Sequence, residues 1–583
     1  MGPDDLTTAL SSVADITGHG LRFLDRHGRP DMHPWAAIVA RARTTAGRLI
    51  ATGIGPGDRV ALVYPTGPAF FDAFFGALLA GAVPVPLYPP VRLGRLDEYH
   101  PRTARMIEVA GASLVLTDRT ILRLLGPAIE QAKPALGVLL LEGLNEGSPT
   151  HAEASPDQLG LVQFSSGTTG EPKAVALTHH ALMAQTHALQ TRMLRAFPED
   201  EHCEHSGCSW LPLYHDMGLI GCVFPALVHG ASLTLIRPEH FIARPATWLR
   251  ALSDHKATIS VAPNFAYALC TERIQDAELD GVDLSHWRIG LNGAEPVAPS
   301  TLMAFVERFS QWGLRAETLS PVYGLSEAAL AVTFSDLERP FTTRHYDREA
   351  LATRGEATPD ETGRAHVSLG RPLPGFEVVI RGGTGEALPE RMQGHIWARG
   401  PSLMQGYLSA PEATQDALQD GWLKTGDLGF FDEGELFVTG RAKDLIILRG
   451  RNHEPQVIEE AVQHVEGVRR GCTAAVSTLH EGDATERLLL FIETPREGQA
   501  PDPETLTNRC TQAVRERVGL TIDQIVILSP GTLPRTSSGK IRRAETLARH
   551  QSGMLTAPEP VSWWRLTRHL IHSAKALRRS RSS

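Results

Sequence analysis

One stretch decides the fold of this chain: Leu159-Gly-Leu-Val-Gln-Phe-Ser-Ser-Gly-Thr-Thr-Gly-Glu-Pro-Lys-Ala-Val-Ala-Leu-Thr-His-His180. Its apolar start, residues 159–164, predicts a buried strand. The loop that follows combines hydroxyls with glycines, which let backbone N–H groups converge on an anion. Lys173 adds a mobile positive charge. Thr178 is expected to be the N-cap of a helix that contains His180. Strand, loop, lysine and helix together indicate a triphosphate cradle.

The loop differs from a Walker A sequence, because Lys173 does not directly follow a glycine and no Ser or Thr comes after it. An ordinary polar turn uses the same residue types, so the rest of the chain must decide between the two interpretations. The candidate phosphate-binding residues are Ser165, Ser166, Gly167, Thr168, Thr169 and Gly170.

The size of the chain predicts more than one domain, because 583 residues exceed what one compact core accommodates. An apolar share of 42% and a charged share of 21% are typical of a soluble globular protein. A net charge of −9 argues against a general nucleic-acid binder. Six scattered cysteines predict no disulfide framework, and the N-terminus resembles no signal peptide, so we expect a cytoplasmic protein.

Buried strands alternate with helices along the first half of the chain, which predicts an α/β architecture with largely parallel sheets. Residues 35–50 and 70–79 have helical apolar spacing. Ligands bind such sheets at the carboxyl ends of the strands. The predicted strands are residues 59–63, 83–87, 114–117, 232–236, 258–262, 288–291 and 318–322.

The second half of the chain changes character. Residues 335–362 are polar with little periodicity, which indicates an inserted excursion. Residues 378 onward show hairpin chemistry with a turn at 381–385. Beyond residue 441, a helix at 455–465 and strands at 471–476 and 488–492 indicate a small separate α+β domain.

The ordered set of segments, from about residue 35 to residue 543, resembles the adenylate-forming superfamily of acyl-CoA synthetases, acyl-AMP ligases and peptide-synthetase adenylation domains. Within it, four segments and the spacer before residue 369 are most similar to fatty acyl-AMP ligases. These segments are Leu211-Pro-Leu-Tyr-His-Asp-Met-Gly-Leu219, Ala262-Pro-Asn-Phe-Ala-Tyr267, Asn292-Gly-Ala-Glu-Pro-Val297 and Gly440-Arg-Ala-Lys-Asp-Leu-Ile-Ile-Leu-Arg-Gly-Arg-Asn452.

The resemblance implies a large N-terminal domain of several subdomains, with mostly parallel sheets and a β-rich part, and a small mobile α+β C-terminal domain. We expect boundaries at residues 1–440, with an insertion at about 335–366, then 441–550, and a tail at 551–583. Lys443 matches the hinge position about which the small domain rotates.

The resemblance also assigns an ATP and Mg²⁺ site. The 165–170 loop and Lys173 would hold phosphates, and Thr168 and Glu327 would coordinate Mg²⁺, a cation that prefers oxygen ligands. Asp427 and Arg441 would contact the ribose. Tyr323 would lie on the adenine face, and the other side of the pocket would be lined by Gly293, Ala294 and Glu295. The residues after Tyr323 that would also bind the cofactor are Gly324, Leu325 and Ser326.

Two further residues would act on the acid. Lys540 would bridge the substrate carboxylate and the α-phosphate, stabilising charge where it redistributes. His215 would lie near the carboxylate and orient the acid or gate its pocket. Taken singly, each has a plainer interpretation, such as a solvated loop lysine.

Other interpretations of single motifs are weaker. Residues 324–328 approximate a hydrolase nucleophile elbow, but Ala328 stands where that motif has Gly. Residues 201–208 are rich in Cys, His and Glu, yet their spacing fits no common zinc site. Glu454 stands where the ligases often have an aromatic residue, which leaves the acceptor thiol in question.

The tail, residues 561–583, has apolar residues at helical spacing, five or more basic residues and no acidic one. Such a helix fits an anionic membrane or an acidic carrier protein; packing on its own C-terminal domain is the alternative.

Together these features predict a ligase that activates a fatty acid as acyl-AMP and transfers the acyl group to a carrier-protein phosphopantetheine thiol. A fatty acyl-CoA synthetase and an inactive adenylate-binding scaffold are the alternatives.

Overall fold

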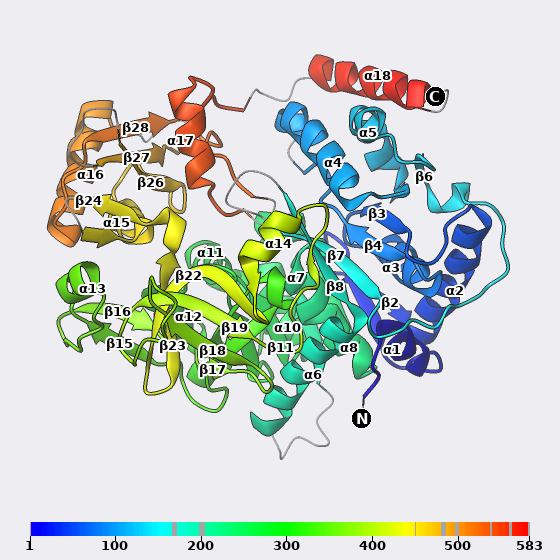
Figure 1. The fold of residues 1–583 in the computed structure, drawn as a ribbon, viewed down its shortest axis with the longest axis horizontal. Coiled ribbons are helices and arrows are strands. Elements are labelled where there is room, and N and C mark those ends of the chain that lie inside the picture. The colour runs from blue at the N-terminus through cyan, green and yellow to red at the C-terminus, as the bar shows by residue number, and fades with distance from the viewer. Residues whose placement is uncertain are drawn as a thin grey trace.

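The computed structural model describes residues 2–91, 93–165, 172–196, 205–448, 451–479, 486–495, 501–536, 539–558 and 563–580. Figure 1 shows a large lobe built by the N-terminal three quarters of the chain and a smaller lobe beside it. Residues 166–170 of the predicted phosphate loop and residues 201–204 of the Cys/His-rich segment lie outside the described residues.

The first sheet of the large lobe is parallel, with strand order β4-β3-β5-β6. Its strands are β3 (Arg59–Val63), β4 (Val83–Pro86), β5 (Leu114–Thr117) and β6 (Val138–Leu139). Asp118 caps helix α5 (Arg119–Ala132) by accepting hydrogen bonds from the N–H groups of Thr120 and Ile121. The associated helices are α2 (Trp35–Ala51), α3 (Pro68–Leu79), α4 (Leu96–Ala110) and α5 (Arg119–Ala132).

The second sheet has nine strands in the order β17-β14-β13-β12-β11-β9-β10-β1-β2, and its central pairs are parallel. The α/β prediction with mostly parallel sheets is therefore confirmed. Its strands are β1 (Gly20–Leu24), β2 (Pro30–Pro34), β9 (Gly207–Ser209), β10 (Leu233–Ile236), β11 (Ile259–Ala262), β12 (Ile289–Asn292), β13 (Leu319–Gly324), β14 (Ala331–Phe334) and β17 (Arg371–Pro372). The helices in this part include α6 (His179–Ala196), α9 (Pro238–Ala243), α10 (Ala246–Asp254), α11 (Asn264–Arg273) and α12 (Pro299–Phe309).

The opening stretch forms the predicted strand and helix, with a second strand between them that the sequence did not predict. Strand β7 (Leu159–Ser165) pairs antiparallel with β8 (Lys173–Thr178), and α6 follows directly. Sequence reasoning missed β8 because its apolar run is short and the lysine was assigned to the loop. The predicted cap is confirmed, since Thr178 Oγ1 accepts a hydrogen bond from Ala181 N at 3.1 Å. Strand β20 (Gly406–Tyr407) extends the hairpin.

The β-rich part carries an antiparallel sheet. The predicted turn is present, because Gly382 N donates to Glu386 O at 2.9 Å, but the partner strand begins only at Gly394. Segment 382–393 is therefore a longer connection than the sequence suggested. The strands are β18 (Glu377–Arg381), β19 (Gly394–Arg399), β21 (Leu418–Gln419), β22 (Trp422–Asp432) and β23 (Glu435–Arg441), with helix α14 (Pro411–Ala417) beside them.

The polar insertion predicted at residues 335–362 forms regular secondary structure. Strands β15 (Thr343–Tyr346) and β16 (Arg364–Val367) pair antiparallel, with helix α13 (Arg348–Arg354) between them. Tyr346 Oη and Arg344 Nη1 each lie 2.7 Å from Asp432 Oδ2 of β22, which fixes the excursion on the large lobe. Arg364 pairs with Glu454 of the small lobe.

The small lobe has α+β character, with its own buried apolar clusters. A central sheet in the order β26-β27-β28 is accompanied by the pair β24-β25. The elements are β24 (Ile446–Leu448), β25 (Arg451–His453), α15 (Pro455–Val462), β26 (Thr473–Thr478), β27 (Arg487–Glu493), α16 (Pro503–Val518), β28 (Gln524–Leu528) and α17 (Arg543–Gln551).

The tail forms helix α18 (Trp563–Ser580), which lies on α4 and α5 of the large lobe (Figure 1). Packing on its own C-terminal domain, the alternative weighed from the sequence, is therefore wrong. Ser573 Oγ accepts a hydrogen bond from Gly126 N at 2.8 Å, and Ser573 and Ala576 are each 1% exposed. Among the described residues, no helix combines the length and apolarity that crossing a bilayer requires.

Candidate active site

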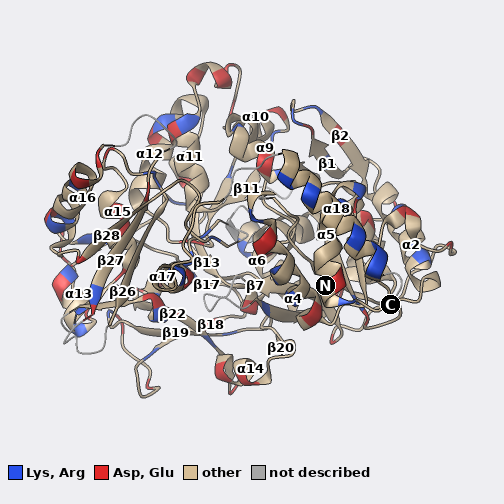
Figure 2. Cartoon of the chain, turned by 90° about the horizontal axis from the view of Figure 1, so that it is seen from above, with Lys and Arg blue, Asp and Glu red and all other residues tan. Residues whose placement is uncertain are grey.

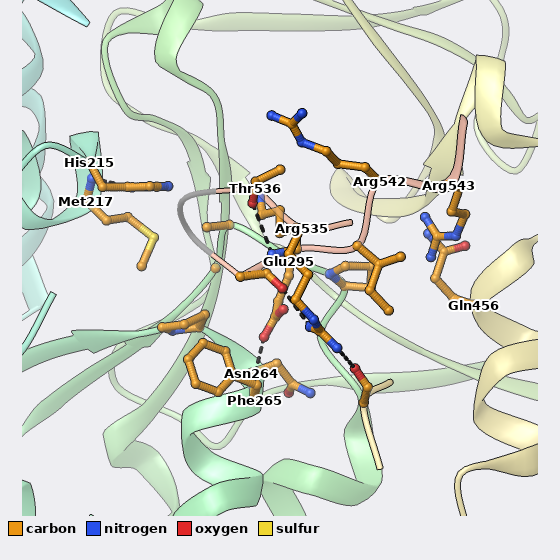
Figure 3. Close-up of a pocket in the computed structure, with 18 of the residues that line it drawn as sticks. His215, Met217, Asn264, Phe265, Glu295, Gln456, Arg535, Thr536, Arg542 and Arg543 are labelled. Carbon is orange, nitrogen blue, oxygen red and sulfur yellow. Dashed lines mark hydrogen bonds between the residues drawn. The ribbon is translucent and has the colours of Figure 1, made fainter. Parts of the chain in front are cut away.

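A cavity of about 3570 Å³ lies between the two lobes, at the carboxyl ends of β12 and β13. Both lobes contribute polar side chains to it, as the close-up in Figure 3 shows. Every described residue in the predicted site lines this cavity: Ser165, Lys173, His215, Gly293, Ala294, Glu295, Tyr323, Gly324, Leu325, Ser326, Glu327, Asp427, Arg441, Lys443 and Lys540.

Asp427 is held between two of these residues. Its Oδ2 accepts a hydrogen bond of 2.7 Å from Tyr323 Oη, and its Oδ1 lies 3.2 Å from Arg441 Nε. The pairing of β22 with β23 places Asp427 opposite Arg441, whereas Tyr323 comes from β13 of another sheet. Burial, and then the Asp427 carboxylate, raise the pKa of the Tyr323 hydroxyl well above its ordinary value. Tyr323 therefore remains a hydrogen-bond donor.

Glu327, the carboxylate predicted to bind Mg²⁺, lies in the short turn that follows β13. Its Oε1 accepts a hydrogen bond of 2.8 Å from Tyr407 Oη. Lys173 Nζ lies 4.5 Å from the centroid of the Tyr407 ring, within the range of a cation–π contact. Tyr407 thus connects the carboxylate proposed for a metal with the lysine of the opening stretch.

The segment after β12 has an unusual backbone. Ala294 has a φ of 68°, a left-handed conformation that costs free energy in a non-glycine residue and occurs often at functional sites. A Cβ on Gly293 would lie 2.8 Å from a Val322 methyl group. Glu295 Oε1 accepts a hydrogen bond of 2.6 Å from Phe265 N (Figure 3). Burial raises the pKa of Glu295, and the Phe265 N–H, Lys540 and Arg535 partly offset this effect.

Lys540 reaches this cavity from the far end of the chain. Its backbone N–H donates to Thr536 Oγ1 at 3.0 Å, which shapes the turn that carries it. Burial, and then Arg441, lower the pKa of the Lys540 ammonium, while Glu295, Asp216 and Asp427 act in the opposite direction. Acidic groups from three separate segments therefore surround this one lysine.

His215 is joined to Asp216 and Ser326. His215 Nδ1 lies 2.6 Å from Asp216 Oδ1, and the Ser326 hydroxyl donates to Asp216 Oδ2. Ser326 precedes Glu327 in a short helical turn, residues Ser326–Ala328. The backbone of Gly324 lies so close to β14 that a Cβ there would be 1.8 Å from Leu330 O.

Lys443 is in the 3-10 turn Ala442–Asp444, directly after β23. Burial, and then the neighbouring Arg441, lower its pKa. It therefore stands where the chain passes from the large lobe to the small one.

Among the cavity residues that the sequence analysis did not assign, Asp216, Tyr407 and Arg535 contact the predicted site. Arg535 donates to Gly539 O and Gly471 O, each at 2.7 Å, and lies near Glu295. The sequence did offer a signal for Asp216, because it directly follows His215. It offered no signal for Tyr407, because this residue reaches Glu327 only through the pairing of β20 with β8.

Within the described part of the chain, no cluster of three or more Cys, His, Asp and Glu is arranged to hold a metal by itself. Cys208 of the 201–208 segment is buried in β9, and residues 201–204 were not described.

Comparison with known proteins defines the class of this protein. The model of the family described as AMP-binding enzyme matches residues 28–408. The chain therefore belongs to the AMP-binding, adenylate-forming enzymes, as its fold and the residues around the cavity indicate.

Within this family, the chain is 33% identical over 559 residues to a long-chain-fatty-acid–AMP ligase, FadD26, from Mycobacterium marinum, covering 91% of this chain and 93% of the relative. It is 34% identical over 556 residues to a Caulobacter vibrioides protein whose name, an acyl-CoA synthetase, is provisional; 94% of this chain and 95% of that protein are covered.

The solved structures that are similar to this chain include fatty acyl-adenylate ligases. One, from a study of fatty acyl-adenylate ligases from E. coli and L. pneumophila, has a TM-score of 0.85 at 34% identity, covering 94% of this chain and 98% of its own. Another, an L. pneumophila fatty acyl-adenylate ligase in complex with acyl adenylate and pyrophosphate, has a TM-score of 0.70 at 30% identity; the coverages are 94% and 96%.

Proposed function

We propose that this protein is a fatty acyl-AMP ligase, which activates a fatty acid with ATP and passes the acyl group to a carrier-protein phosphopantetheine thiol. The observation that carries the proposal is the position of Lys540, which lies in one cavity with Glu295, Asp427 and Asp216 although it belongs to the small lobe. A cation delivered there suits a reaction between two anions.

In the first half-reaction, a carboxylate oxygen of the acid attacks the α-phosphorus of ATP. The bond from that phosphorus to the oxygen bridging to the β-phosphate breaks, and pyrophosphate leaves with the electron pair. Lys540 neutralises charge on the carboxylate and α-phosphate oxygens as they approach. Asp427, fixed by Tyr323 and Arg441, accepts hydrogen bonds from the ribose hydroxyls.

Mg²⁺ fits the donor set of this cavity. Glu327 is a hard oxygen ligand whose Oε1 accepts a hydrogen bond from Tyr407, and its Oε2 would bind the cation. Glu327 and Thr168 would hold the ion, which would neutralise phosphate charge and polarise the α-phosphate. Thr168 lies outside the described residues.

The acyl chain occupies the apolar part of the cavity. This part is formed by helices and strands of the large lobe, whose side chains exclude water from a long hydrocarbon. The apolar lining includes Leu189, Gly221, Val261, Leu269, Leu330 and Phe334.

In the second half-reaction, the acceptor thiolate attacks the acyl carbon and AMP leaves. We infer that the small lobe, residues 441–550, rotates at Lys443 so that Lys540 withdraws and the thiol enters. Glu454, where an aromatic residue was expected, is engaged by Arg364 of the insertion, residues 335–366. This ion pair joins the insertion to the small lobe and accounts for a carboxylate at that position.

A fatty acyl-CoA synthetase is the second candidate, favoured by the name of the Caulobacter vibrioides relative. The test is incubation of the purified protein with ATP, Mg²⁺, a panel of fatty acids and either CoA or a holo-carrier protein. Acyl-carrier protein without acyl-CoA is the expected result. Abundant acyl-CoA would reject the carrier acceptor, and no pyrophosphate release with any acid would favour the scaffold.

We further infer peripheral contact of this protein with an anionic membrane through the outer face of α18. The apolar inner face of the helix is already packed on α5, so only the outer face is available. Trp563 and Trp564 are 85% and 87% exposed, and Arg568 and Lys575 are exposed on the same helix. Figure 2 shows the basic residues of α18 in blue along the helix. Tryptophan and basic residues suit the headgroup region of an anionic bilayer.

Co-sedimentation with phosphatidylcholine vesicles, with and without phosphatidylglycerol, tests this contact. We expect binding only to the anionic vesicles, and loss of binding when Arg568→Glu is combined with Lys575→Glu. The control combines Lys256→Glu with Arg315→Glu, an equal charge change at exposed positions outside α18. Equal sedimentation of all variants would contradict a role for α18.

A further inference from the structure

Asp216 is a buried carboxylate at the centre of the cavity. It begins the short helix α7 (Asp216–Gly218) and is 6% exposed. Its Oδ1 accepts a hydrogen bond of 2.7 Å from Met217 N and lies 2.6 Å from His215 Nδ1. Its Oδ2 accepts a hydrogen bond from the Ser326 hydroxyl. Both oxygens are thus engaged by three donors from two segments.

This carboxylate is ionised. Burial alone would raise the pKa of Asp216, but His215, Ser326 and the Met217 N–H hold it at about 2. Within the described part of the chain, its ion-pair partner is His215 rather than an arginine or a lysine. The carboxylate is therefore stabilised by hydrogen-bond donors, which are the imidazole, the Ser326 hydroxyl and the Met217 N–H.

The geometry determines which imidazole nitrogen carries a proton. An ionised carboxylate has no hydrogen to donate, so the 2.6 Å contact requires a proton on Nδ1 of His215. Met217 N is 3.3 Å from Nδ1 but only 2.7 Å from Asp216 Oδ1, so its hydrogen belongs to the carboxylate. Nε2 is left as the atom that faces the cavity, into which the His215 ring points (Figure 3).

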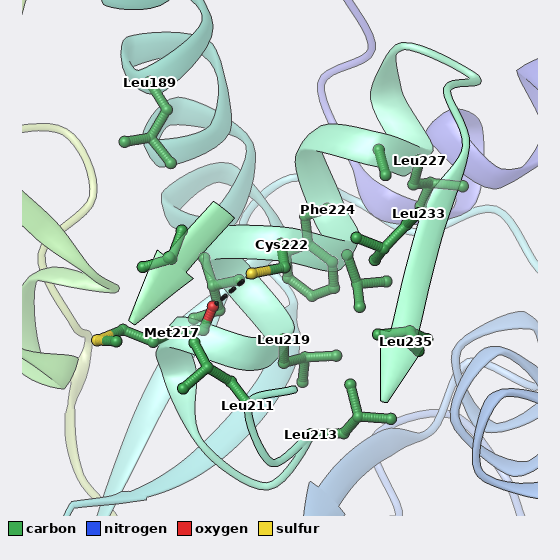
Figure 4. Packing of buried hydrophobic residues seen from close by; sticks show 14 of the residues in the cluster. Leu189, Leu211, Leu213, Met217, Leu219, Cys222, Phe224, Leu227, Leu233 and Leu235 are labelled. Atoms are coloured by element: carbon green, nitrogen blue, oxygen red, sulfur yellow. Dashed lines mark hydrogen bonds between the residues drawn. The ribbon is translucent and has the colours of Figure 1, made fainter. Parts of the chain in front are cut away.

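The surroundings keep this arrangement rigid. Leu211, Met217 and Leu219, on both sides of the pair, are buried in the apolar cluster drawn in Figure 4. Gln163 of β7 donates from Nε2 to Tyr214 O at 2.7 Å, which anchors the residue before His215. The hydrogen bond from Ser326 also connects Asp216 to the turn that contains Glu327.

We propose that Asp216 is a positioning residue, which holds His215 with a proton on Nδ1 and directs its ring into the cavity that takes the acid substrate. It acts through His215 and does not touch the reacting atoms. The inference rests on the proposed adenylation and adds a residue to its machinery. Carboxylates commonly fix the tautomer and orientation of a functional histidine in this way.

The first test needs no substrate, so it is separate from the test of the proposed function. Histidine is labelled with ¹⁵N in the full chain, and the signals missing from the His215→Gln spectrum are assigned to His215 among the 24 histidines. We expect a protonated Nδ1 in the wild-type protein. In Asp216→Asn the amide can donate to Nδ1, and we expect protonation to move to Nε2. A wild-type His215 protonated at Nε2 alone would overturn the proposal.

The second test measures single-turnover formation of acyl-AMP. Asp216→Asn should lower the rate about 10–100-fold, the usual cost of losing such a partner. In the His215→Gln background, the same change should add little, because Asp216 acts through His215. Asp216→Glu, which retains the charge, should recover part of the rate.

Losses that multiply in the double variant would show that Asp216 works independently of His215, and the proposal would fail. Thermal denaturation checks that each variant is folded. If Asp216→Asn does not fold, the His215 tautomer measured in the wild-type protein and in Ser326→Ala still tests the proposal. Ser326→Ala leaves the Nδ1 contact in place and should keep the Nδ1–H form; loss of that form there would also reject the assignment.

Discussion

At the scale of single residues, the site depends on charges that are partly withdrawn from water. Arg441, Glu295, Asp216 and Asp427 all act on the pKa of Lys540 inside one cavity. Each charge there acts more strongly than it would at the surface, because the surrounding medium screens it less. The removal of one such group therefore has a larger effect on the reaction than on the fold.

Lys540→Ala should slow pyrophosphate release about 100-fold or more, because the transition state loses its mobile cation. Transfer from added acyl-AMP should change much less, since that step does not require the lysine. Lys575→Ala, an exposed lysine on α18, is the control and should match the wild type. Equal loss in both half-reactions would contradict the assigned role. The measurements are pyrophosphate release and thiol acylation.

Tyr323→Phe removes the hydroxyl that donates to Asp427. One hydrogen bond to a charged group contributes about 1.5–3 kcal/mol, and Arg441 still holds the carboxylate, so we expect KM for ATP to rise about tenfold. The KM for the fatty acid should stay unchanged. Initial rates at varied ATP check this prediction, and a change in the KM of the acid instead would contradict it.

At the scale of elements, the insertion contains a buried histidine. His366 of β16 is 7% exposed and its ring lies 5.9 Å from Tyr346 and 6.3 Å from Phe430, centroid to centroid. Burial, followed by Arg364 and other nearby charges, lowers its pKa from 6.5 to about 3. The folded state thus keeps this imidazole neutral over a range in which the unfolded chain binds a proton.

This difference predicts acid sensitivity. Stability is complete above pH 6.5 and declines as pH falls towards 3, because the unfolded state takes up more protons in that interval. At pH 5 the loss from His366 is about 2 kcal/mol. His366→Leu should reduce the difference in unfolding free energy between pH 7 and pH 5 by that amount, measured with urea. His151→Leu, at an exposed position outside the insertion, should leave it unchanged.

At the scale of the whole molecule, the small lobe is attached to the large one at several points besides the chain itself. Arg95 Nη2 donates to Gly531 O at 2.7 Å, and Arg549 pairs with Glu98 at 2.9 Å. Beyond α17, residues 552–562 lead to α18, which is docked on α5. Arg565 pairs with Asp97 and Arg579 with Glu130 along this contact.

The docking of α18 depends on a close approach of two helices. A Cβ on Gly126 would lie 2.1 Å from Ser573 O, so Gly126→Val must displace α18. We expect limited proteolysis to remove the tail about tenfold faster or more, since cleavage follows the population of the undocked state. Gly143→Val, where nothing lies within 4 Å of an added Cβ, is the control. Tail removal at the wild-type rate in Gly126→Val would show that α18 does not depend on this contact.

The sequence by itself determined the α/β class and most buried strands, because hydrophobic periodicity is a local property. The site residues were predicted from a family resemblance, and those that the structure describes line one cavity. Sequence reasoning failed where local signals were short or ambiguous, as in β8, the longer connection after β18, and the folded insertion. Only the tertiary structure decided that Tyr407 contacts Glu327, that Asp216 contacts both His215 and Ser326, and that α18 packs on α5. These contacts join residues that are far apart in the sequence. Local sequence patterns do not reveal which of these residues come together when the sheets and lobes pack.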